Sequence, residues 1–109
     1  MWDELLEALR GTGIPFAEQE WRNVGSLKSD YGILRLRGAG DSSWADGHQQ
    51  AEAMVAAVHL FTRSAGLSQA EQIKAVLNSI EGLSFRLTDN IYENDTKLTH
   101  WVWTVEWGE

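Results

Sequence analysis

Hydrophobic and polar residues alternate most regularly near the C-terminus, over residues 98–107. Read with a period of two, Trp101, Trp103 and Trp107 fall on one side of an extended strand. Indole rings bury large apolar areas, so this side can form either a core or a contact with a partner. We expect Trp101 and Trp103 to pack in the core, and Trp107, at the end of the strand, to be available to a partner.

The first ten residues have the spacing of an amphipathic helix. Apolar residues recur at i, i+3, i+4 and i+7, at Trp2, Leu5, Leu6 and Leu9. Acidic residues lie in the first turns, where the helix dipole favours negative charge. Two glycines, Gly11 and Gly13, then predict the end of this helix.

A second helix is predicted over Gln69–Glu81. Ser68 and Glu71 have the S-x-x-E spacing of a capping box at its start. Gly82 fits the position just after its end. Its apolar stripe consists of Ile73, Val76, Leu77 and Ile80. We expect this stripe to pack against the tryptophan strand.

Other segments alternate as strands do, namely Ala17–Trp21, Tyr31–Arg37, Ser43–Ala45 and Leu83–Thr88. Polar stretches rich in Gly, Ser, Asn and Asp predict loops or turns at 22–30, 38–43, 46–47 and 92–96.

Residues 48–64 are ambiguous. Their alanines are strong helix formers, and Met54, Val58 and Phe61 follow helical spacing. The same stretch also alternates with a period of two, as a strand does. The local pattern alone favours a helix here.

Length and charge limit the possible functions. A chain of 109 residues forms one domain with one core. Its net charge of −7 argues against a protein that binds a nucleic-acid groove through clustered Lys and Arg. There is no cysteine, which excludes disulfides and thiolate metal sites. The acidic N-terminus does not have the form of a signal peptide, and no run is long enough to cross a membrane, so we expect a soluble intracellular protein.

The candidate metal ligands and nucleophiles form no recognised motif. His48, His59 and His100 lie far apart in sequence and would bind a metal only if the fold brought them together with carboxylates. The glycine-rich stretch 38–43 lacks the endings of a P-loop and of a nucleophile elbow. Ser42, Asp46 and His48 are close in sequence, whereas the members of a catalytic triad are usually scattered.

Two acidic groups could also act chemically. Glu18 and Glu20 would share one face of a strand, as an acid–base pair could. Asp89, Glu93 and Asp95 could hold a cation near a hairpin. A solvated surface is the simpler interpretation of both groups. We therefore predict no catalytic residue, no metal site, no cofactor and no enzymatic activity.

Several short stretches, taken in order, carry a resemblance to a known family. They are residues 5–17 (LLEALRGTGIPFA), 31–34 (YGIL), 43–47 (SWADG) and 58–62 (VHLFT), followed by the capped helix and the aromatic strand. In this combination the chain resembles the tail terminator, or tail completion, proteins of long-tailed bacteriophages, a family of minor capsid type. It departs from them in the alanine-rich segment 49–57, where the family is usually β-rich, and in the link 63–67.

The resemblance implies an α+β fold in one domain, residues 1–109. This fold is a mixed, mainly antiparallel sheet with two helices packed on one face. It also implies that about Ala51–Thr62 is a strand, against the local preference for a helix.

The function that the resemblance implies is assembly of the virion. Copies of the protein would form a ring, commonly a hexamer, that caps the head-proximal end of the tail tube and joins the tail to the head. Its partners would be itself, the tail tube protein and the neck connector protein, with no membrane contact. DNA would pass through without sequence-specific binding. The protein would be assembled in the host cytoplasm and reside in the virion tail.

We expect ring contacts at sheet edges and in the loops 22–30 and 38–48. The candidate interface residues are Tyr31, Arg35, Trp44 and Trp107. Two alternatives stay open. One is another head–tail joining component. The other is a small acidic inhibitor or immunity-type protein that masks a basic partner, suggested by the size, the charge and the aromatic content.

Overall fold

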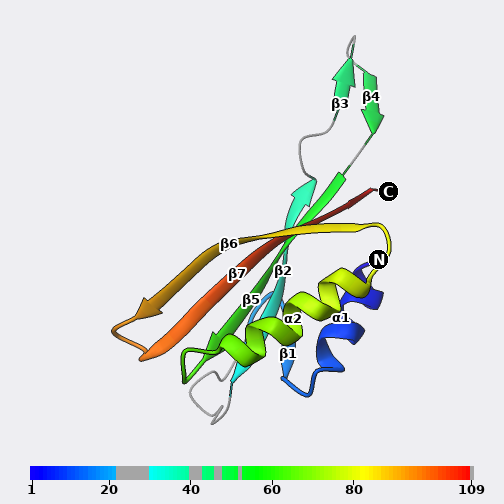
Figure 1. The fold of residues 1–109 in the computed structure, drawn as a ribbon. Helices are drawn as coiled ribbons and strands as arrows, with labels where there is room; N and C mark the ends of the chain where they lie inside the picture. Colours follow the sequence, from blue (N-terminus) through cyan, green and yellow to red (C-terminus); the bar gives the residue numbers. More distant parts are fainter. Residues whose placement is uncertain (22–29, 40–42, 46–47, 52, 109) are drawn as a thin grey trace.

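The computed structural model describes residues 1–21, 30–39, 43–45, 48–51 and 53–108. In chain order its elements are α1 (Trp2–Arg10), β1 (Phe16–Glu18), β2 (Tyr31–Ala39), β3 (Ser43–Ala45), β4 (His48–Ala51), β5 (Ala53–Thr62), α2 (Leu67–Ser79), β6 (Leu83–Glu93) and β7 (Leu98–Gly108). The main sheet has the strand order β1-β2-β5-β7-β6, with β1 parallel to β2 and the other pairs antiparallel. Both helices lie on the same side of this sheet (Figure 1). The predicted α+β fold is confirmed.

The face of the main sheet beneath the helices, which we call the covered face, is apolar. Its strands contribute Leu34, Ala56, Val58, Leu60, Trp101, Trp103, Val105 and Trp107 to the core. Leu5 and Leu9 of α1 and Ile73 and Leu77 of α2 are fully buried in the same core. Burial of each such side chain contributes about 1.5–3 kcal/mol. The predicted packing of the tryptophan strand with the second helix is confirmed.

Residues 48–51 and 53–62 form strands, so the helix favoured by the local pattern of this segment is wrong. β5 pairs along its length with β7 and along most of it with β2. Ala56, Val58 and Leu60 point into the core and are 0% exposed. Helix propensities among ordinary residues differ by at most about 0.7 kcal/mol each. Two hydrogen-bonded ladders and a buried face outweigh that preference. The strand expected from the family resemblance over about Ala51–Thr62 is confirmed for Ala53–Thr62, whereas Ala51 belongs to β4.

The second helix starts and ends earlier than predicted. α2 begins at Leu67, and its N-cap is Gly66, with a φ of 79° and no capping side chain. The predicted Ser68–Glu71 capping box is therefore wrong. A Cβ at Gly66 would lie 2.4 Å from the Thr62 hydroxyl, so only glycine fits this tight turn out of β5. The C-cap is the extended Ile80 rather than the predicted glycine, because Ile80 turns into the core.

The predicted ends of two strands also need correction. β1 spans Phe16–Glu18 rather than Ala17–Trp21, because Gln19 adopts a φ of 67° and leaves the strand. β6 continues to Glu93, past a bulge between Leu87 and Asp89, so the predicted turn at 92–96 is displaced to 94–97. α1 spans Trp2–Arg10, as predicted. Outside the described residues lie 22–29 of the predicted loop 22–30, residues 40–42 and the predicted turn 46–47.

The parallel strand β1 packs against β2 through the aromatic ring of Phe16. Phe16 is 3% exposed and pairs in register with Gly32 of β2. A Cβ at position 32 would lie 2.2 Å from the Phe16 ring. The ring therefore occupies the space that a side chain at position 32 would need.

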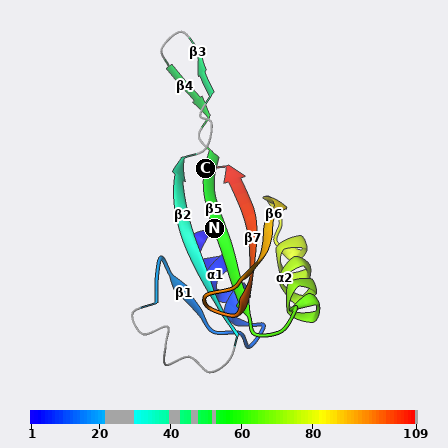
Figure 2. The same cartoon turned by 90° about the vertical axis from the view of Figure 1, so that its left-hand side faces the viewer.

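The pair β3–β4 lies apart from the main sheet. The two strands pair antiparallel with each other, and among the described residues neither pairs with the main sheet. This pair, which we call the arm, projects from one end of the molecule, opposite the β6–β7 turn (Figures 1 and 2). The Cα radius of gyration is 15.0 Å, against about 13 Å for a compact chain of this length. The molecule is therefore elongated.

Candidate functional site

The predicted interface residues do not lie together. Tyr31 and Arg35 are on the face of the main sheet opposite the helices, whereas Trp107 belongs to the covered face. The expectation that Trp107 is available at a free strand end is wrong, because this residue is only 7% exposed and pairs with Met54. The side chain of Trp44, in β3, lies outside the described part of the structure. The role of these residues in an interface stays a prediction.

Tyr31 and Arg35 both make contacts within the single chain that stabilise its fold. Tyr31 is 5% exposed, and its ring stacks on Phe61 at a centroid distance of 4.8 Å. Trp21 meets the same ring edge-on at 6.5 Å. Arg35 is exposed, and its Nε and Nη2 atoms donate to the Gln19 carbonyl at 3.1 and 3.0 Å. The guanidinium thus holds the chain where it leaves β1.

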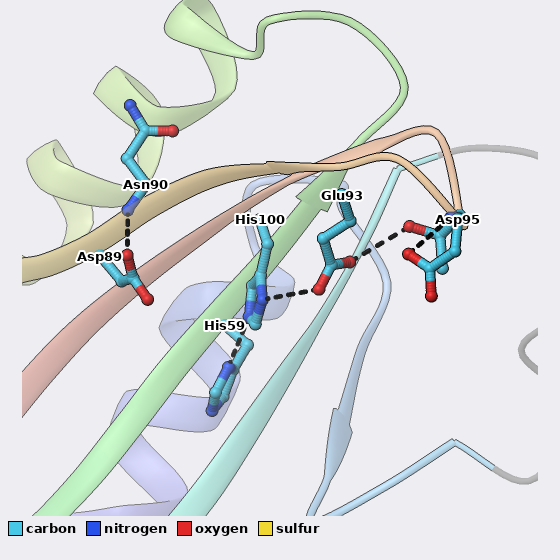
Figure 3. Close-up of polar contacts among 7 residues, drawn as sticks. His59, Asp89, Asn90, Glu93, Asp95 and His100 are labelled. Atoms are coloured by element: carbon cyan, nitrogen blue, oxygen red, sulfur yellow. Dashed lines mark hydrogen bonds and ion pairs between the residues drawn. The ribbon is translucent and has the colours of Figure 1, made fainter.

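The face opposite the helices, which we call the open face, carries a cluster that the sequence did not reveal. It includes Tyr31, Ile33, Arg35, Ala57, His59, Phe61, His100 and Val102. The His59 Nδ1 and His100 Nε2 atoms, from β5 and β7, lie 2.8 Å apart (Figure 3). The His100 ring also stacks on Phe61, with centroids 4.1 Å apart. The two histidines, 41 positions apart in sequence, therefore share one site.

Glu93 extends this pair to the end of β6. Its Oε2 atom lies 3.6 Å from His100 Nδ1, and its Oε1 atom accepts a hydrogen bond of 3.1 Å from the Thr96 hydroxyl. Figure 3 shows the resulting chain of contacts from the middle of β5 to the β6–β7 turn. The carboxylate favours a proton on His100 Nδ1. This leaves His100 Nε2 as the acceptor for the Nδ1–H of His59.

The environment keeps both rings neutral at pH 7. Burial lowers the pKa of His59 from 6.5 to about 4, with further lowering from positive charge on His100, Arg35 and Arg37. Burial also lowers the pKa of His100, although the Glu93 carboxylate acts in the opposite direction. Together the rings can accept protons, but within the described part of the chain neither ring is hydrogen-bonded to the hydroxyl of a Ser, Thr or Tyr that could act as a nucleophile.

The other candidate groups have structural contacts. Glu20 lies beyond β1, so the predicted face shared with Glu18 is wrong, and Glu18 accepts a hydrogen bond from the Trp2 indole. The Asp89 and Asp95 carboxylates each accept from the next backbone amide, at 2.9 and 3.0 Å. No group of three or more His, Asp or Glu side chains among the described residues is arranged to hold a metal ion.

The residues Ser42, Asp46 and His48, whose closeness in sequence argued against a catalytic triad, fall largely outside the described part of the structure. Ser42 and Asp46 lie outside the described residues, and for His48 only the backbone, in β4, is described.

The shared site of His59 and His100 follows from strand register. Because Phe61 lies opposite His100 and His59 lies opposite Val102, the two histidines are diagonal neighbours. This register is the signal that would have found them, and it requires the pairing of β5 with β7.

Comparisons with known proteins place the chain in no family. No protein-family model matches it, and no curated protein does. Among the described residues, neither helix has the length and apolar character needed to cross a membrane.

Proposed function

We propose that the protein is a structural component of a bacteriophage tail. Copies of it form a ring that caps the head-proximal end of the tail tube and joins the tail to the head. The contacts are with further copies, with the tail tube protein and with the neck connector protein, while DNA passes through without sequence-specific binding. This role requires no catalytic residue.

The observation that carries the proposal is the secondary structure of β5. The local pattern of this stretch favours a helix, whereas the family resemblance requires a strand over about Ala51–Thr62. Residues Ala53–Thr62 form a strand at the centre of the sheet. The resemblance therefore made a prediction that differed from the local preference and was correct, which supports its use for function.

The arm also supports a role in assembly. An isolated two-stranded hairpin is at best marginally stable in water. Among the described residues the arm has no third strand, so a neighbouring molecule is the natural place for its missing contacts. An extended element that gains its packing on assembly suits a protein whose function is to join other proteins.

The edge of the main sheet offers a second contact surface. β6 is an edge strand of eleven residues, Leu83–Glu93. Three of its large apolar side chains, Leu87, Ile91 and Tyr92, are 49%, 52% and 54% exposed. Long edge strands with exposed apolar side chains are sites of pairing with other chains. This fits the expectation that ring contacts use sheet edges.

The direct test is to assemble tails without the protein and measure them by electron microscopy. We expect tails of irregular length that do not join to heads. Tails of normal, uniform length with normal head joining would refute the proposal. Mass measured with and without tail tubes gives a second readout, in which the protein should bind tube ends as an oligomer.

A pair of variants connects this test to the arm. Trp44→Ala should reduce binding to tube ends, because this residue is a candidate interface residue in the arm. Leu67→Ala removes an apolar side chain that is 67% exposed at the start of α2 and serves as the control. Both variants should keep the thermal midpoint of the parent protein. A strict monomer that ignores tubes and instead binds a basic protein would favour the inhibitor alternative.

A further inference from the structure

The His59–His100 contact has room for one hydrogen atom. Nδ1 of one ring faces Nε2 of the other at 2.8 Å, so one nitrogen donates and the other accepts. The contact survives when both rings are neutral, and it survives a single added proton, which leaves one acceptor in place. When both rings are charged, two N–H groups face each other and the contact must break.

Each ring is bound to a different part of the sheet. His59 lies in the middle of β5, where the positive charges of Arg35 and Arg37 of β2 act on it. His100 lies near the start of β7, beside Glu93 at the end of β6. The Glu93 side chain in turn accepts from Thr96 in the β6–β7 turn, and the Glu93 carbonyl accepts from the Lys97 amide at 2.8 Å. His100, Glu93 and the turn therefore form one unit.

Charge on the surrounding elements determines which way the pair separates. Tyr31, Arg35 and Arg37 face the pair from β2, and Asp89 and Glu93 face it from β6. A charged His100 is attracted to the two carboxylates of β6, whereas a charged His59 lies beside the arginines of β2. Repulsion between the rings thus moves His100 with the hairpin end, away from β5.

We propose that the His59–His100 pair is a proton-operated latch, which holds the end of the β6–β7 hairpin against β5 and releases it when both rings become charged. Release separates the ring stack at Phe61–His100 and opens the pairing of Thr62 with Thr99. The turn between β6 and β7 curls across the face of the sheet that the helices do not cover (Figure 2), so its movement uncovers this part of the open face. This inference does not depend on the proposed function in tails.

The test compares hydrogen exchange of backbone amides in the hairpin end, residues 93–100, with exchange in the core of β7, residues 102–105, between pH 7 and 3.5. Intrinsic exchange rates are corrected for pH. In the parent protein, protection of the hairpin end should fall by about tenfold or more, the effect of one pKa unit on a linked equilibrium. Core protection should change less. The imidazole signals of the pair, followed by NMR, should show uptake of the second proton near pH 4, over the same range.

The decisive variant is His59→Asn. An amide group can donate or accept by rotation, so it keeps the contact with His100 at every pH and carries no charge. Its hairpin end should stay protected at pH 4. His48→Asn, in β4 of the arm, is the matched control and should behave as the parent protein does. If the hairpin end of His59→Asn loosens over the same pH range, or if hairpin end and core lose protection together in the parent, the latch is refuted.

If His59→Asn does not fold, the parent protein still decides the question. Protection of the hairpin end must then follow the second imidazole titration. A loss of protection at a pH where neither imidazole titrates would overturn the proposal.

Discussion

The two faces of the main sheet differ in chemistry and in what their residues do. The covered face is filled by aliphatic side chains and indoles, and its packing with α1 and α2 forms the core. The open face also buries residues, among them Tyr31 and Ala57, but places two histidines and a carboxylate beside them. The first face determines how stable the fold is. The second determines how that stability depends on protons.

The difference follows from how each kind of interaction depends on its surroundings. Apolar burial is roughly proportional to area and does not depend on direction or pH. A hydrogen bond between two imidazoles depends on distance, angle and protonation state. A substitution on the covered face should therefore change the free energy of unfolding at all pH values. A substitution in the histidine pair should change its pH dependence.

The largest expected effect is that of Trp103→Ala on the covered face. Trp103 is 3% exposed and stacks with Trp101 at a centroid distance of 6.0 Å. Its truncation should cost about 3–5 kcal/mol in the free energy of unfolding, as for other large buried aromatic residues. Urea denaturation at pH 7 measures this loss. A variant that stays as stable as the parent but no longer assembles would show that Trp103 serves an interface rather than the core.

Two valines of β7 provide a matched control for this comparison. Val105 is 0% exposed on the covered face, and Val102 is 8% exposed on the open face. Each truncation to Ala removes two methyl groups, worth about 1–2 kcal/mol by area. Val105→Ala should cost more, because it also leaves a cavity beneath the helices. Equal losses would contradict the distinction between the two faces.

A smaller effect is expected in the pH dependence of stability. The folded-state pKa of His59 lies below its usual value of 6.5, so the fold favours the neutral ring. The stability linked to this residue is fully present above pH 6.5 and is lost as the pH falls towards 4. The urea midpoint of the parent should therefore drop over this range, and that of His59→Asn should drop less. If the urea midpoints of the two proteins fall equally with pH, the His59 ring does not contribute to the pH dependence of stability.

The smallest effect is expected for Glu18→Gln. The Glu18 carboxylate accepts from the Trp2 indole at an exposed site, where such contacts contribute little. The amide oxygen of Gln can still accept this bond. The free energy of unfolding should change by less than about 0.5 kcal/mol, within the range of ordinary surface substitutions. A loss comparable to that of a valine would mean that this contact determines the position of α1.

Periodicity was enough to predict what α2 and β7 contribute to the covered face, but not what β5 contributes, and it did not predict the open face. The stripe of α2 and the alternation of Trp101 and Trp103 are local patterns, and both packed as expected. The ends of elements were less predictable. Gln19 is held by a contact with Leu36, 17 positions away, and the turn at Gly66 is set by its close approach to Thr62, which periodicity does not indicate. The site of His59 and His100 depends on the register between strands 41 positions apart. No local pattern carries that information.

The packing of the Phe16 ring against Gly32 limits which substitutions this protein can accept at these two positions. The ring lies where a side chain at position 32 would have to stand. A mutation that adds a side chain there is tolerated only together with a smaller residue at position 16. Such a double change must pass through an intermediate with either a clash or a void beside α1. Substitutions at position 16 in β1 are therefore coupled to substitutions at position 32 in β2. We expect these two positions to change together or to stay unchanged.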